Sequence, residues 1–319
     1  ASLYRAMGVY PRAEELYRQA LAIRLKLGGG HPDVAESLHD LGSLNKLTGA
    51  YVAAEKLFQE ALAIRQARLG QNLEVAQTES ALGAVYQAIG DLRRAEPLYK
   101  DALAIRQQRL AADHPDVAES LSDLAALYLA MADFAQAQAL YQQALTIRQK
   151  RFGAEHPAVA LSLSDLGSVE KARGDFPRAE RLLLQALALR LKRPGGESHP
   201  ETAHSHHRLG ALYFAMGDYP RAEQAYNRAL QIRQRRFGAD HPEVAESLSF
   251  LATLYIATGR TAQAITYLTR AMVTSERLLR AVGMVSSEAR MDALLGYLTD
   301  HCCQGQSCGT KASRRRTTC

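Results

Sequence analysis

The feature that most constrains the fold is a segment of about 42 residues that the chain repeats. The segment opens with a His-Pro pair at His31, His114, His156, His199 and His241. The last four of these histidines are spaced by 42, 43 and 42 residues, and the longer interval after the first holds two periods. The sequence NLEVAQT, from Asn72, fills its middle position. Seven repeats result, with the first one shortened, and such an array buries its core only by stacking neighbouring repeats.

The pattern within each repeat predicts two helices. In the second repeat the first helix is expected from Pro32 to Thr48, because its apolar residues follow helical spacing. Gly49 then suits a left-handed C-terminal cap. The second helix follows a turn such as GDYPRAE, with proline tolerated at its first position, and continues to Leu69. The apolar residues of the first helix are Val34, Leu38, Leu41, Leu44 and Leu47.

One face of each second helix alternates small and large residues. In the second repeat Ala54 is followed four positions later by Phe58, and Ala61 comes three positions after that. These spacings place the three side chains on one helix face. The alanines let a neighbouring helix approach closely, and the ring is expected to fill the gap between helices.

These residues resemble the tetratricopeptide repeat. Leu41-Gly42, Ala54, Phe58 and Ala61 match its signature positions, while the period and the HPDVAESL opening look most like the kinesin-light-chain variety. The resemblance covers about residues 1–275 and implies an all-α fold, a right-handed solenoid of about seven helix pairs. A signature tryptophan position holds leucine in several repeats but Glu79 and His206 in the third and sixth, which predicts looser packing there.

The repeat sets the expected domain boundaries. The array ends near residue 282, a capping or linker helix is expected over 286–300, and a tail rich in cysteine and arginine covers 301–319. The tail is expected to be disordered or not native, and SSEARMDALLGYL resembles the linkers that precede bacterial caspase-like peptidase domains. The repeats lie near 1–30, 31–71, 72–113, 114–155, 156–198, 199–240 and 241–282.

The His-Pro histidines pose a choice between chemistry and helix initiation. Proline fits the first helical position, which puts histidine at the cap, and the acidic residues that follow suit the positive end of the helix dipole. Successive histidines are a whole repeat apart, on the order of 10 Å. Zinc needs ligands within about 2 Å. The geometry therefore favours helix initiation over a metal or acid–base site.

Two other clusters could hold a metal. His204 and His207 share a helix face, and Glu246 of the next repeat is a possible third ligand. Two histidines alone are a weak signal, and the alternative is that they line a groove. The four cysteines, all in the last 18 residues, lack the paired spacing of zinc sites. We therefore predict no metal and no cofactor.

Charge and cysteine content limit the other classes. Four of the 39 basic residues fall in the tail without an acidic partner, and the remainder nearly balances 33 acidic residues. This gives no electrostatic case for nucleic acid. No apolar run approaches the roughly 20 residues of a membrane span. The array contains no cysteine, which fits a reducing compartment and predicts a cytoplasmic protein.

The repeats present no recognisable catalytic arrangement. A glycine-rich phosphate loop and a nucleophilic triad are both missing from the pattern, so neither an enzyme nor a small-molecule substrate is predicted. An arginine recurs late in the second helix, where it favours the helix dipole and can meet an acidic residue of the next repeat. These arginines are Arg24, Arg65, Arg106, Arg148, Arg190 and Arg233.

What the resemblance implies about function is a binding surface. In this family the first helices line an inner wall, which suits an extended peptide or a partner helix. A non-enzymatic scaffold for a protein or peptide partner is therefore expected. The alternative is the sensor or regulatory region of a larger signalling protein. The expected binding residues are His39, Ser43, Lys46, Gln87, Ser122, Leu129, Ser164, Lys171, His207, Phe214, Ser249 and Ile256.

Overall fold

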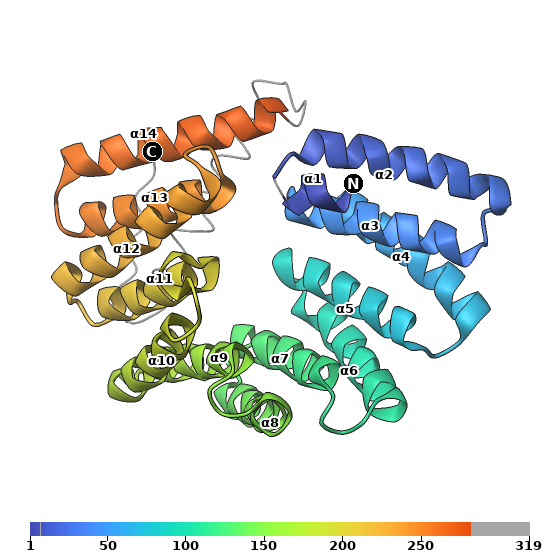
Figure 1. Cartoon of the computed structure of the whole chain (residues 1–319), viewed down its shortest axis with the longest axis horizontal. Coiled ribbons are helices and arrows are strands. Elements are labelled where there is room, and N and C mark those ends of the chain that lie inside the picture. The colour runs from blue at the N-terminus through green and yellow to red at the C-terminus, as the bar shows by residue number, and fades with distance from the viewer. Residues whose placement is uncertain (7, 282–319) are drawn as a thin grey trace, which may run out of the picture. The chain divides into compact units, whose positions relative to one another are not determined.

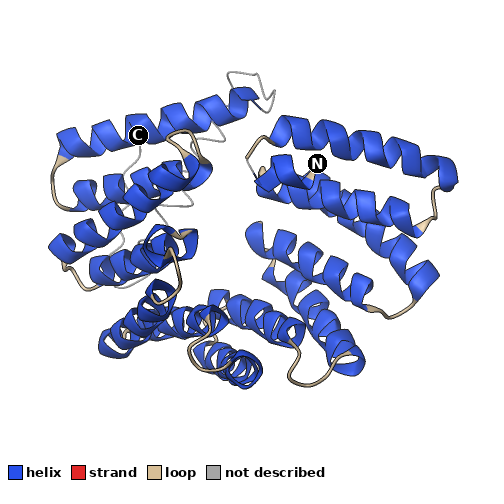
Figure 2. Cartoon of the chain, viewed as in Figure 1, coloured by secondary structure: helices blue, strands red, loops and turns tan. Residues whose placement is uncertain are grey.

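The computed structural model describes residues 1–6 and 8–281, and every regular element within them is helical (Figure 2). These residues form an all-α solenoid of helix pairs, as predicted. The chain divides into two compact bodies, an N-terminal body, Ala1–Leu212, and a C-terminal body that begins at Tyr213. The expected capping helix of 286–300 and the expected tail of 301–319 lie outside the described residues.

Within the N-terminal body consecutive helices pair, from α1 with α2 to α9 with α10, and within the C-terminal body α13 pairs with α14 (Figure 1). In the N-terminal body the helices are α1 (Ser2–Ala6), α2 (Tyr10–Arg24), α3 (Pro32–Leu47), α4 (Tyr51–Leu69), α5 (Leu73–Ala88), α6 (Leu92–Arg109), α7 (Pro115–Ala130), α8 (Phe134–Phe152), α9 (Pro157–Arg173), α10 (Phe176–Leu191) and most of α11 (Pro200–Ala215). Short 3₁₀ turns cover Leu25–Leu27 and Gly196–Ser198. The C-terminal body continues with α12 (Tyr219–Phe237), α13 (Pro242–Ala257) and α14 (Thr261–Ala281).

The His-Pro pairs begin helices, as predicted. Each histidine is the cap residue, and its Nδ1 accepts a hydrogen bond of 3.1–3.3 Å from the backbone N–H two residues later. This bond satisfies one of the amides that a helix N-terminus leaves without a partner. In the third repeat Asn72 takes the same place, and its Oδ1 accepts from the Val75 N–H at 2.9 Å.

The alternation of small and large residues forms the core. Ala54, Phe58 and Ala61 have no exposed surface. Phe58 lies against Gly42 of α3 so closely that a Cβ there would meet the ring at 2.9 Å. Close helix contact at the Leu-Gly signature therefore depends on the absence of a side chain, and it fixes α3 and α4 as one packed pair.

The first helix of each pair forms an inner layer of the N-terminal body. α3 contacts α5, and α5 contacts α7. Each second helix packs between two first helices, as α8 does outside α7 and α9 (Figure 1). We refer to the solvent-facing side of α3, α5, α7, α9 and residues 200–212 of α11 as the inner wall.

Candidate functional site

A recurring arginine lies beneath the first helix of the next repeat, and five of these six arginines are buried. The recurring arginine at the end of each second helix turns under the next repeat, where its Nη1 atom donates to a hydroxyl on the first helix. The six pairs are Arg24–Ser37, Arg65–Thr78, Arg106–Ser120, Arg148–Ser162, Arg190–Ser205 and Arg233–Ser247. Because the spacing is kept from repeat to repeat, the same contact recurs in each interval, with Arg24 partly exposed and the other five arginines buried.

The expected acidic partners of these arginines are present only at the two ends of the series. Arg24 pairs with Glu36 at 2.9 Å, and Arg233 pairs with Glu243 and Glu246, both at 3.1 Å. Among the described residues, Arg65 and Arg190 have no carboxylate within ion-pair distance, and the buried Nε atom of each lacks a hydrogen-bond partner. The arginine thus meets an acidic residue of the next repeat at the two ends of the series, whereas Arg65 and Arg190 bond the hydroxyl without an ion pair.

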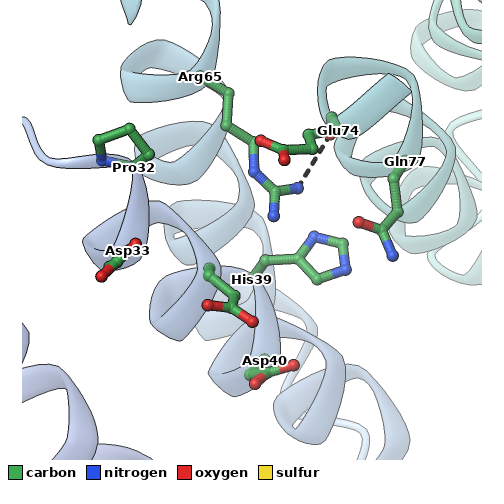
Figure 3. A pocket seen from close by; sticks show the side chains of 8 residues that line it. Pro32, Asp33, His39, Asp40, Arg65, Glu74 and Gln77 are labelled. Carbon is green, nitrogen blue, oxygen red and sulfur yellow. Dashed lines mark hydrogen bonds between the residues drawn. The ribbon is translucent and has the colours of Figure 1, made fainter. Parts of the chain in front are cut away.

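A pocket of about 350 Å³ opens between α3 and α5, above Arg65 (Figure 3). We call it the α3/α5 pocket. The Arg65 guanidinium lies at its base, and its Nη1 donates to the Glu74 carbonyl at 2.9 Å. Figure 3 shows the His39 imidazole between Arg65 and Gln77. The lining residues are Pro32, Asp33, Glu36, His39, Asp40, Arg65, Glu74 and Gln77.

A second pocket occupies the equivalent place three repeats later. This α9/α11 pocket, of about 540 Å³, lies between α9 and α11 above Arg190. Pro157, Arg190, Glu201 and His204 take the repeat positions of Pro32, Arg65, Glu74 and Gln77. Its remaining lining residues are His156, Ala158, Leu161 and Arg193. The repeat therefore builds the same hollow twice, over the same buried guanidinium.

The two pockets differ in charge. Ala158 and Leu161 stand in the second pocket where Asp33 and Glu36 stand in the first. Glu201 is paired with Arg193 at 2.9 Å. The α3/α5 pocket is thus acidic, and the α9/α11 pocket is more apolar with a small excess of positive charge.

The predicted binding residues fall into two groups by burial. His39, Ser164 and Ser249 are buried, and the Ser249 hydroxyl donates to the Ala245 carbonyl at 3.1 Å. Of the partly exposed ones, Gln87 accepts from the Tyr99 hydroxyl at 3.0 Å, and Ser122 donates to the Ala118 carbonyl at 2.9 Å. The partly exposed residues of the N-terminal body are Ser43, Lys46, Gln87, Ser122, Leu129, Lys171 and His207. In the C-terminal body Phe214 is partly exposed and Ile256 is exposed.

The histidine cluster on α11 is engaged with neighbouring side chains. The rings of His204 and His207 lie 6.3 Å apart, and the Nε2 of His204 accepts from the Nε of Arg208 at 2.9 Å. Glu246, the third residue considered as a ligand, is paired with Arg233. Within the part of the chain that the structure describes, no group of three or more His, Cys, Asp or Glu side chains could hold a metal ion.

Several residues that line the pockets are missing from the sequence-predicted set. Arg65, Arg190 and Asp40 belong to these hollows, yet none of the three is in the predicted set. The recurrence of arginine at one repeat position was the available signal for two of them. The sequence could not show that this position lies beneath the inner wall.

Comparison with known proteins settles the family. The tetratricopeptide-repeat model matches residues 1–67, 74–150, 129–192 and 195–272. The chain belongs to the tetratricopeptide-repeat family. Repeats of this family generally serve as non-enzymatic protein-interaction scaffolds, and the match supports that class of function. No curated protein sequence matches the chain significantly.

The solved structures that it resembles include kinesin-light-chain-like tetratricopeptide-repeat proteins, in agreement with the sequence resemblance. BtubC (BKLC) from P. vanneervenii is 28% identical, with a TM-score of 0.54 over 75% of this chain and 93% of that one. A putative kinesin light chain with nearly identical TPR-like repeats from Podosopora anserina is 27% identical, with a TM-score of 0.51 over 64% and 97%. A Rap protein complexed with competence and sporulation factor shares the fold, with a TM-score of 0.65 over 88% and 74% at 14% identity.

None of the helices in residues 1–6 and 8–281 has the length and apolar character needed to cross a bilayer. The cytoplasmic location stays a prediction.

Proposed function

We propose that this tetratricopeptide-repeat protein is a non-enzymatic scaffold that binds an extended peptide segment of a partner protein on the inner wall of the N-terminal body. The observation that carries the proposal is the duplication of one pocket over the same buried arginine, between α3 and α5 and again between α9 and α11. Two concave sites with a few polar groups at fixed positions suit a ligand that places side chains at intervals.

The spacing of the pockets fits an extended chain. Three repeats separate them, or about 30 Å if neighbouring first helices lie about 10 Å apart. An extended chain advances about 3.3 Å per residue, so about nine residues would span the interval. Lys46, Gln87, Leu129 and Lys171 lie on helices within or at the edges of this interval and are partly exposed. They are the proposed contacts of the peptide between its two anchors.

The experiment compares an inner and an outer leucine. Peptides of twelve residues are selected from a displayed random library on the full chain, and their affinities are measured for two variants. Leu161→Lys changes a 40% exposed leucine in the α9/α11 pocket, and Leu184→Lys changes a 44% exposed leucine on α10, the outer helix of the same pair. The inner variant should weaken binding about tenfold or more, as expected for a charge placed in an apolar contact, with the outer variant unchanged.

Two results would contradict the proposal. Selected peptides that bind both variants as tightly as the unchanged chain would show that they use another surface. A library that yields no peptide of measurable affinity would show that the inner wall does not recognise extended peptides.

A further inference from the structure

Asp165 and Asp40 occupy the same repeat position but have different surroundings. Asp165 of α9 pairs with Nη1 of Arg208 on α11 at 2.9 Å. Ala81 of α5 stands in the repeat position of Arg208, next to Asp40 of α3. Among the described residues Asp40 makes no hydrogen bond and no ion pair. The carboxylate of the fifth repeat is therefore neutralised by an arginine of the sixth repeat, whereas the equivalent carboxylate of the second repeat has no such partner in the third.

The surroundings of Asp40 are acidic and partly buried. Asp33 and Glu74 line the same pocket, where the Oδ1 of Asp33 lies 3.7 Å from the Nδ1 of His31 and Glu74 makes no ion pair among the described residues, while Glu36 is held by Arg24 at 2.9 Å. Burial raises the pKa of Asp40, and Arg5, Arg24 and Arg65 act on that pKa only from beyond ion-pair distance. An unpaired, partly desolvated carboxylate gains more from an added positive charge than an exposed one does.

A second, independent feature of the pocket is an unsatisfied hydrogen-bonding group. His39 is 9% exposed and lines the pocket, and its Nδ1 has no hydrogen-bond partner (Figure 3). Its pKa is lowered to about 4, first by burial and then by Arg65, Lys46 and Arg5. The imidazole is therefore neutral near pH 7 and can accept a hydrogen bond from a cationic donor. The equivalent position in the α9/α11 pocket is Ser164.

We propose that the α3/α5 pocket binds the guanidinium group of an arginine side chain from the partner peptide, which takes beside Asp40 the place that Arg208 takes beside Asp165. This inference rests on the proposed peptide-binding function and specifies that the peptide side chain in the α3/α5 pocket is positively charged. Lysine fits less well, because a planar guanidinium can meet the Asp40 carboxylate with two parallel donors and still reach His39. The Arg65 guanidinium opposes the bound cation, and the three carboxylates of Asp33, Asp40 and Glu74 outweigh it.

The decisive variant places an arginine of the chain itself beside Asp40, where the arginine of the peptide is proposed to bind. Ala81→Arg restores the side chain that the sixth repeat carries at this position, so it should fold and pair with Asp40 as Arg208 pairs with Asp165. Ala63→Arg, on the exposed side of α4, adds the same charge elsewhere and is the matched control. Asp40→Asn keeps the shape of the pocket and removes its unpaired charge.

The probe is the peptide Gly-Ser-Gly-Arg-Gly-Ser-Gly, together with versions carrying lysine, norleucine or glutamate in place of arginine. Binding is followed by the ring resonance of His39 in the full chain labelled at histidine, assigned by its loss in His39→Gln. The arginine peptide should shift this resonance saturably. Its affinity should fall about tenfold or more in Ala81→Arg and in Asp40→Asn, the scale expected for a lost charge-assisted bond, and stay unchanged in Ala63→Arg.

The outcomes separate this inference from the proposed function. The charge assignment is overturned if the glutamate or norleucine peptide binds as well as the arginine peptide, if no peptide shifts His39, or if Ala81→Arg has no effect. If library peptides lose affinity in Leu161→Lys but neither contain arginine nor respond to Ala81→Arg, the assignment fails and peptide binding stands. If library peptides ignore Leu161→Lys, the proposed function fails whatever the heptapeptides do.

Discussion

Arg148 at the end of α8 donates from Nη1 to the hydroxyl of Ser162 on α9, and so links the fourth repeat to the fifth. Both side chains are buried, and burial lowers the pKa of Arg148 against the opposing effects of Asp165, Glu119 and Asp123. A buried guanidinium remains charged, so each donor that lacks an acceptor costs stability. The hydroxyl is thus part of the contact between repeats.

Removal of that hydroxyl should destabilise the chain. Ser162→Ala leaves a buried cationic donor without its acceptor, and we expect a loss of about 1–3 kcal/mol in the free energy of unfolding. Ser43→Ala, at a partly exposed serine, should change stability by less than about 0.5 kcal/mol. The measurement is urea unfolding followed by circular dichroism.

The double variant gives the control. Arg148→Met with Ser162→Ala removes donor and acceptor together, so its loss should be smaller than the sum of the two single losses. Strict additivity would show that the two side chains stabilise the fold independently.

A second prediction concerns the turn between α7 and α8. Ala132 has φ of 60°, in a position where Gly49 and Gly90 both have φ of 81°. The left-handed conformation costs a residue with a Cβ about 1–2 kcal/mol. Glycine avoids this cost, but it loses more conformational entropy on folding than alanine does, which offsets part of the gain. Ala132→Gly should therefore stabilise the chain by about 0.5–1 kcal/mol.

The matched control is two residues earlier. Ala130→Gly makes the same change at the last residue of α7, where the backbone is helical, and should destabilise the chain by about 0.5–1 kcal/mol. If Ala132→Gly lowered the melting temperature as Ala130→Gly does, the strain inferred from the positive φ would be wrong.

Helix positions were largely predictable from the sequence. The first helix of the second repeat is predicted from Pro32 to Thr48 and lies at Pro32–Leu47, because proline and the glycine turn mark its ends. The buried alanine and ring positions are predictable too. Apolar residues recur at helical spacing along each second helix, and the neighbouring repeat presents the same pattern to them. The buried face of each second helix follows from this.

The binding surface was less predictable, because burial there depends on the neighbouring repeat. His39 and Ser164 were predicted to contact a partner, but both are buried. Asp40 and Asp165 share one repeat position, and only the residue on the following first helix decides which of them is paired. Sequence spacing gives the helix face, whereas side-chain packing between repeats determines exposure and pairing.

A third prediction uses the buried carboxylate of Glu79, which occupies a position held by Leu38, Leu121, Leu163 and Leu248 in other repeats. Glu79 is 3% exposed and its Oε2 has no hydrogen-bond partner. Burial, and then Asp101, raise its pKa to about 7, with an opposing hydrogen bond from Gln66. Glu79→Leu should therefore stabilise the chain at neutral pH by about 1–3 kcal/mol.

The sign of its pH dependence follows from the pKa. The folded pKa lies above the unfolded value of 4.5, so the fold favours the protonated acid and is penalised most above pH 7. The advantage of Glu79→Leu over the unchanged chain should be larger at pH 8 than at pH 5. Asp123, whose pKa burial also raises to about 7, is present in both proteins and cancels in the difference. An equal advantage at both pH values would mean that Glu79 is not a buried, ionising group.

A fourth prediction concerns His39, whose pKa shift has the opposite consequence. Its folded pKa of about 4 lies below the unfolded value of 6.5, so the fold favours the neutral imidazole. The stability that His39 contributes is complete above pH 6.5 and is lost as pH falls towards 4. Serine is the natural replacement, because Ser80, Ser122 and Ser164 occupy this position in the next three repeats.

His39→Ser should therefore lower stability most at pH 8, where the neutral ring packs edge-on against Phe58 with centroids 5.2 Å apart. The loss there should be about 1–2 kcal/mol, as expected for a buried aromatic contact. Between pH 6.5 and 4 the difference should shrink, because protonation penalises the fold only when the histidine is present. Urea unfolding at several pH values measures it. A difference that stays constant or grows on acidification would mean that the imidazole is charged in the folded chain, and would remove it as an acceptor in the α3/α5 pocket.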